Sequence, residues 1–201
     1  MTRFLFLPAV VLVAFLTAPA NAADDILAKL VPPRNGSNVC FKAEYDKAYL
    51  AAHPRQTSRS VLLSLQYETS EAGDGGRFVR LAVERLAPPA KLFMVGGCAF
   101  NETANLVQGK RLFPASRGDA GVSCGLFPGL GSDQKGGDIL IQPSADERTA
   151  MLYLPGRLAA WRGSDQSREA VPVELGAADQ VFRLRNVYPE NCSSLAALRV
   201  K

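Results

Sequence analysis

The sequence predicts an all-β domain of mainly antiparallel strands, folded as a β-sandwich or as a closed or partly closed β-barrel. Three observations predict this class: short segments of alternating polar and apolar residues, turn-rich connections between them, and only one or two short helices near the N-terminus. Neither helix is long enough to link parallel strands. With 201 residues, 47% hydrophobic and 21% charged, the composition is that of a globular chain and excludes a disordered one.

Residues 1–22 are predicted to be a cleaved secretory signal peptide. Arg3 precedes an apolar run over residues 4–16, and Ala20-Asn21-Ala22 has the small-x-small pattern of a cleavage site. The run is shorter than the roughly 20 residues that span a bilayer, so no membrane span is expected after cleavage. Residues 23–201 then form a single β-rich domain in the periplasm or outside the cell.

Period-two alternation defines the predicted strands. It is clearest where Val61, Leu63 and Leu65 alternate with polar residues, and the turn-rich stretch 69–76 then predicts a hairpin. Gly96 and Gly97 predict a bend or bulge in the fourth strand. The predicted strands are residues 39–45, 59–68, 77–85, 91–99, 137–142, 149–154, 158–161, 171–175 and 180–187. Their inward faces predict a core of Val61, Leu63, Leu65, Val79, Leu81, Val83, Ile139, Ile141, Phe182 and Leu184.

Two short helices and one long loop complete the prediction. Asp24 or Asp25 is expected to cap a helix that ends at Pro32-Pro33, and Asp46 to cap a second helix over residues 47–52. Residues 118–137 contain seven glycines, which predicts the longest loop of the domain.

The four cysteines indicate structural disulfides in an oxidising compartment. No C-x-x-C occurs, and the single histidine, His53, cannot complete a zinc site at finger spacing, so no metal or cofactor site is predicted. Four cysteines allow three pairings. We favour Cys98–Cys124 together with Cys40–Cys192, the second of which would tie the first strand to the last.

Charge excludes some classes of partner. Removal of Arg3 with the signal leaves 22 basic against 19 acidic side chains, a net charge of +3, spread evenly along the chain. Without a basic stripe or tail, no nucleic-acid partner is predicted.

Catalytic motifs are tested and set aside. Residues 121–125 match the G-x-S-x-G nucleophile motif, but that chemistry needs a histidine later in the chain, and His53 precedes the motif. Asp133 and Asp138 are too few oxygen ligands for a calcium loop. No catalytic residue is therefore named, although two carboxylates that are distant in sequence could still meet in a groove.

A set of aromatic residues forms the candidate lining of a ligand pocket inside a barrel. These residues are Tyr153, Trp161, Phe182 and Tyr188. Plain core packing is the other interpretation of the same residues, and the one we favour.

Three stretches resemble a family of small exported bacterial proteins of unassigned function. They are YDKAYLAAHP at residues 45–54, Cys124-Gly125 with Gly136-Gly137-Asp138-Ile139, and LGAADQVFRL at residues 175–184. The family has an acidic Cys-Asp-Gly-Gly step where this chain has Gln134-Lys135-Gly136-Gly137. The resemblance implies a bacterial cell-envelope setting and brings no activity.

Together these observations predict an exported, disulfide-stabilised β-rich protein. We expect a non-catalytic protein that binds a small ligand or an envelope protein. A hydrolase that works through paired carboxylates is the alternative, so enzymatic activity stays open.

Overall fold

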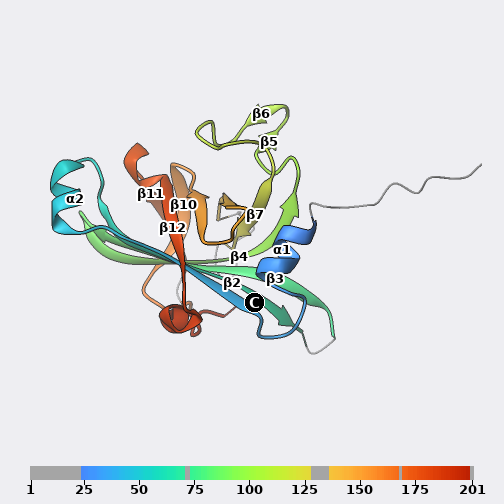
Figure 1. Cartoon of the computed structure of the whole chain (residues 1–201). Helices are drawn as coiled ribbons and strands as arrows, with labels where there is room; N and C mark the ends of the chain where they lie inside the picture. The colour runs from blue at the N-terminus through green and yellow to red at the C-terminus, as the bar shows by residue number, and fades with distance from the viewer. Residues whose placement is uncertain (1–23, 71–72, 128–135, 168, 200–201) are drawn as a thin grey trace, which may run out of the picture.

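The computed structural model describes residues 24–70, 73–127, 136–167 and 169–199, and β-strands are the main secondary structure of these residues (Figure 1). Two short helices, α1 (Asp24–Leu30) and α2 (Lys47–Ala52), lie at opposite ends of the molecule. The strands are β1 (Asn38–Glu44), β2 (Ser58–Thr69), β3 (Gly75–Leu86), β4 (Pro89–Asn101), β5 (Leu106–Val107), β6 (Lys110–Arg111), β7 (Gly121–Leu126), β8 (Asp138–Pro143), β9 (Thr149–Tyr153), β10 (Arg157–Arg162), β11 (Val171–Glu174) and β12 (Val181–Val187); 3-10 turns η1 (Ala177–Asp179) and η2 (Pro189–Leu195) flank the last strand.

Eight antiparallel strands close into a barrel. Their order is β4-β3-β2-β1-β12-β9-β8-β7, and β7 pairs back onto β4 through residues 96–101. The first half of β4 instead pairs with β10 at Leu92 and Phe93, and β11 adds to β10 outside the ring. The all-β prediction is thus confirmed, and closure decides for the barrel over the sandwich.

The barrel interior is filled by the alternating apolar residues. All ten predicted core residues are at most 1% exposed, so the predicted strand faces are confirmed. Helix α1 adds Leu27 and Leu30, and Val31 follows in the same core cluster. Pro32 and Pro33 come directly after, which ends the helix there because proline lacks the amide hydrogen.

The predicted loop over residues 118–137 is wrong in part, because β7 lies within it and closes the barrel. Glycine in this segment allows the backbones of neighbouring strands to approach closely. A Cβ on Gly96 would lie 2.4 Å from the carbonyl oxygen of Gly125 on the neighbouring strand. Residues 128–135, which include Asp133, lie outside the described residues, as does the predicted signal peptide.

Of the bend or bulge expected at Gly96 and Gly97, the bulge is absent from the pairing with β3. The register between β3 and β4 runs unbroken from Arg77↔Cys98 to Leu86↔Pro89. The two glycines instead mark the point at which β4 changes partner from β10 to β7. The register irregularity that does occur lies in β2, between Ser58 and Ser60.

Both favoured disulfides are present. Cys98 and Cys124 are directly opposite each other on β4 and β7, while Cys40 of β1 bonds to Cys192. Cys192 lies in η2, so the expectation that this bond ties the first strand to the last strand is corrected. Pro189 begins η2 after β12, and the turn folds back onto the outer face of β1 and β2.

The C-terminal segment is held to the outside of the barrel by a buried arginine. Arg80 of β3 is 5% exposed and donates from Nε to the carbonyl oxygen of Leu198 at 2.7 Å. Its guanidinium also binds the side chains of Gln66 and Glu68 on β2. Across the described residues, no helix has the length and apolar character needed to cross a bilayer.

Candidate functional site

The outer face of β12 presents two arginines. Alternation along the strand sends Phe182 and Leu184 into the core, where both are 0% exposed, and turns Arg183 and Arg185 outward. The strand sits between β1 and β9 in the barrel wall, so these arginines project over a continuous surface of three strands.

Strand register places the neighbours of these arginines in two rows. In one row Lys42 of β1, Arg185 of β12 and Thr149 of β9 are directly opposite one another. In the next row Arg183 is opposite Met151 of β9, which is in turn opposite Gln142 of β8. Side chains that are directly opposite share a face of the sheet. Three cations therefore gather over β1 and β12.

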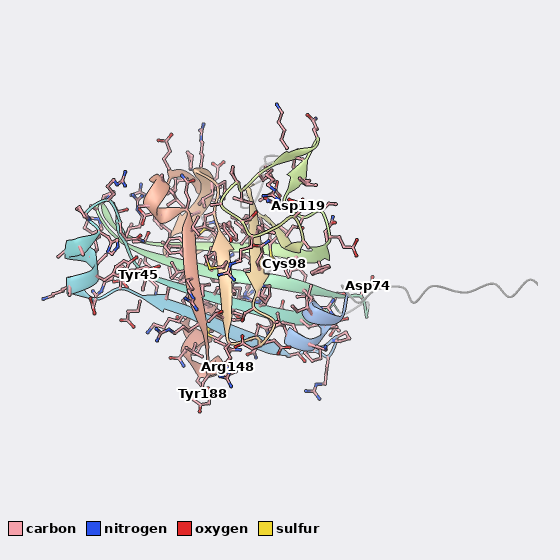
Figure 2. All side chains as sticks on the ribbon, turned by 45° about the horizontal axis from the view of Figure 1, so that its top comes forward. Tyr45, Asp74, Cys98, Asp119, Arg148 and Tyr188 are labelled. Carbon is pink, nitrogen blue, oxygen red and sulfur yellow. A yellow bond between two sulfur atoms is a disulfide. The ribbon has the colours of Figure 1, made fainter. Side chains whose placement is uncertain are left out.

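All the side chains of these two rows except Gln142 line an open groove of about 750 Å³. We call it the basic groove and define it by six of its lining residues: Lys42, Tyr45, Tyr49, Met151, Arg183 and Arg185. In Figure 2 the labelled Tyr45 and Asp119 lie on opposite sides of β12 and mark the two sides of this face.

The charge balance of the groove is positive. Of the described residues that line it, Glu44 is the one carboxylate, and it pairs with Lys42 at 2.7 Å. The hydrogen bond and charge of Lys42 lower the pKa of Glu44, so this carboxylate is ionised and already engaged. Neither Arg183 nor Arg185 has an ion pair or a side-chain hydrogen bond with any residue that the structure describes. Two guanidinium groups thus face solvent without a counterion from the described part of the chain.

Stacked aromatic rings form one wall of the groove. Asp46 caps α2 as predicted, accepting a hydrogen bond from the Tyr49 amide at 2.7 Å. The cap sets the first turn of the helix so that the Tyr49 ring stacks on Tyr45 at 4.7 Å between centroids. The His53 ring stacks on the other side of Tyr49 at 4.0 Å. Desolvation, then the nearby Tyr49 and Asp179, raises the pKa of Tyr45 to about 12.

A buried carboxylate anchors the start of β12. Asp179 is 0% exposed and accepts hydrogen bonds from the amides of Thr57 and Ser58, the latter at 2.8 Å. The Thr57 hydroxyl and the Gln56 amide also donate to it, at 2.6 and 3.1 Å. Since Asp179 lies two residues before β12, this network fixes the strand that displays the arginines. Sequence reasoning missed it because nothing local indicates which distant amides a carboxylate meets.

A second pocket, of about 360 Å³, continues the basic groove across β9 toward β8. Thr149, Met151 and Arg183 line both spaces. We call the second space the side pocket. It is also lined by Arg117 and Asp119, which belong to the loop between β6 and β7 that covers this part of the barrel. Asp119 accepts a hydrogen bond from Arg111 Nε at 2.8 Å.

The four aromatic residues predicted to line a pocket do not meet. Phe182 lies inside the barrel, and Trp161 lies in a separate cluster on the outer face with the C-terminal segment. Tyr188 is 78% exposed. Tyr153 is buried beneath the covering loop, with its ring 6.0 Å from that of Phe113, and borders a small pocket of about 260 Å³. The rings are separated because Phe182 points into the closed barrel, whereas Tyr153 and Trp161 point outward from different strands into two separate clusters.

The remaining predicted positions form no recognisable catalytic group. Ser123 of the G-x-S-x-G match lies within strand β7, whereas the nucleophile motif needs a turn between a strand and a helix. Asp138 borders the small pocket near Tyr153. The described residues contain no group of three or more histidine, cysteine or acidic side chains that could hold a metal ion.

Comparisons with known proteins found no match. No protein-family model, no curated protein and no solved structure matches this chain.

Proposed function

We propose that the chain is an exported binding protein of the cell envelope that holds an anionic ligand in the basic groove. The single observation behind this proposal is the cationic cluster: Lys42 and Arg185 are directly opposite on paired strands, and Arg183 is beside them. The proposal makes no use of a catalytic residue.

The energetics of the sheet support a binding role. Like charges directly opposite each other on neighbouring strands are destabilising. Glu44 offsets the charge of Lys42 alone, so an anion bound at Arg183 and Arg185 would relieve the remaining repulsion. Guanidinium groups suit this purpose because they bind carboxylates and phosphates through two parallel hydrogen bonds.

The proposed compartment rests on the disulfides and the N-terminal sequence. Two disulfides join Cys40 to Cys192 and Cys98 to Cys124. Such bonds persist in oxidising compartments and are rare in the cytosol. Together with the predicted signal peptide over residues 1–22, they support export to the periplasm or beyond.

The hydrolase alternative has less support. Paired-carboxylate hydrolysis needs two acidic side chains in one groove. Among the residues that the structure describes, the basic groove and the adjoining side pocket have one carboxylate each, Glu44 and Asp119, and each already pairs with a cation, Lys42 and Arg111 respectively. The small pocket near Tyr153 has Asp138 as its carboxylate among the described residues. The lowered pKa of Glu44 also disfavours a role as a proton donor. These observations favour binding over hydrolysis.

Calorimetric titration with a simple amphiphilic anion tests the proposal. Octanoate should bind the wild-type protein, and the double variant R183Q/R185Q should weaken that binding at least about tenfold, because each charge-assisted hydrogen bond contributes about 1.5–3 kcal/mol. The matched control is R157Q, which neutralises an exposed arginine on β10, away from the groove. Equal octanoate affinity in the wild type and the double variant would contradict the proposal.

A further inference from the structure

Resting on the proposed function, we infer that the ligand is elongated and carries an anionic group at each end, one held by Lys42, Arg183 and Arg185 and the other by Arg117. The ligand class is a dianion whose two charges are about 10 Å apart, joined by an apolar middle. The basic groove and the side pocket would then form one bipartite site.

Continuity of the two spaces is the first argument. Arg183, Met151 and Thr149 line both. A ligand bound at the arginines of β12 can therefore extend across β9 without leaving the hollow surface. The basic groove alone is wide enough for a compact anion, so the side pocket matters only to a longer molecule.

Strand register sets the length of that molecule. Arg183, Met151 and Gln142 form a row across β12, β9 and β8. Neighbouring strands lie about 4.8 Å apart, so the row spans about 10 Å. At its far end the Arg117 amide donates to Gln142 Oε1 at 3.3 Å, which places Arg117 beside the end of the row.

The charges at the far end leave Arg117 available. Among the described residues, Asp119 is the carboxylate that lines the side pocket, and Arg111 of strand β6 binds it through a hydrogen bond of 2.8 Å. Arg117 has no ion pair with any residue in the described ranges. The side pocket thus presents a second cation that its own carboxylate does not neutralise.

The middle of the row is uncharged. Met151 lies between Arg183 and Gln142 and is partly exposed to both spaces. A thioether side chain contacts hydrocarbon well and offers little to a charged group. The pattern of cation, methionine, cation therefore fits an anionic group, an apolar middle and a second anionic group.

A length series of α,ω-dicarboxylates, each compared with the monocarboxylate of the same carbon number, tests the inference by calorimetry on the intact protein. The dicarboxylate should bind about tenfold more tightly, with the largest advantage near decanedioate. Arg117→Gln should remove this advantage and leave monocarboxylate affinity unchanged. The control K110Q neutralises an exposed cation of strand β6, which precedes the loop of Arg117, and should retain the advantage.

The outcomes separate this inference from the proposed function. If dicarboxylates and monocarboxylates bind equally at every length, or if R117Q weakens both equally, the bipartite site is refuted while the anionic groove stands. If Arg183→Gln changes neither affinity, the proposed function fails as well. Blocked peptides with two glutamates, compared with decanedioate in the same assay, show whether the dianion comes from an acidic protein segment or from a free diacid. The bipartite site stands in either case, provided that R117Q removes the advantage of the second carboxylate.

Discussion

Neutralising Arg185 should stabilise the ligand-free protein, although it should weaken ligand binding. Arg185 is exposed and directly opposite Lys42, and Arg183 lies two positions away on the same face of β12. Removal of its charge in Arg185→Gln relieves both repulsions. Glutamine is shorter than arginine but keeps a polar, uncharged end group, and Arg185 is exposed, so the packing of the strand is preserved.

The expected magnitude follows from the register. At a charge separation of about 7 Å in water, each pair interacts by about 0.6 kcal/mol. Two repulsions, from Lys42 and Arg183, are partly offset by the attraction of Glu44, which already pairs with Lys42 at 2.7 Å. The net gain on removing the Arg185 charge is therefore about 0.6 kcal/mol in the free energy of unfolding, at low salt and without ligand.

Urea unfolding at low and high sodium chloride measures this gain. At 1 M salt the screening length falls to about 3 Å, so the difference from wild type should vanish. The matched control is Arg157→Gln, because Arg157 on β10 is directly opposite Glu174, a residue of the other sign. R157Q should destabilise by a similar amount. Destabilisation by R185Q at low salt, or a gain that persists at 1 M salt, would refute the argument from like charges.

Two further predictions concern the groups that position the groove. Asp179→Ala leaves the backbone amides of Thr57 and Ser58 without an acceptor, which should lower the free energy of unfolding in urea by about 3–5 kcal/mol. Asp179→Asn keeps one acceptor oxygen and should lower it less. A decrease below about 1 kcal/mol for D179A would contradict the anchoring role. The pKa of Tyr45 is raised from its ordinary value of 10 to about 12, so its contribution to stability is fully present below pH 10 and is lost as pH rises toward 12. Tyr45→Phe should therefore show a shallower loss of stability over this range, and identical pH profiles for the two proteins would count against the burial of the phenol.

The core of the barrel was predictable because alternation is a local property. Alternation with polar residues predicts that Val61, Leu63 and Leu65 face inward, whatever strand lies beside them, and each is 0% exposed. The Asp46 cap was predictable for the same reason, since its hydrogen bond reaches only three residues along the chain. Strand β7 was not predictable, because its glycines lower the strand propensity of the segment. Glycine is needed there because the backbones of Gly96 and Gly125 approach closely, which is visible only once β4 and β7 are paired.

The sequence predicts the direction of the arginine side chains of the candidate site, but not their neighbours. The alternation of Phe182 and Leu184 with Arg183 and Arg185 indicates that the arginines point outward. It does not indicate what lies beside them, because a strand's neighbours in a barrel come from distant parts of the chain. Lys42 lies more than a hundred residues before Arg185, yet the two are directly opposite each other.

The sequence by itself determined the class of fold, the faces of its strands and the supply of cysteines for two disulfides, since these follow from local periodicity and residue type. Only the tertiary structure decided that the sheet closes, that β12 lies between β1 and β9, and that cations from separate segments share one groove with an aromatic wall. The physical reason is that strand pairing depends on hydrogen bonds between distant segments, so the register that unites Lys42, Arg185 and Arg183 exists only once the barrel has formed.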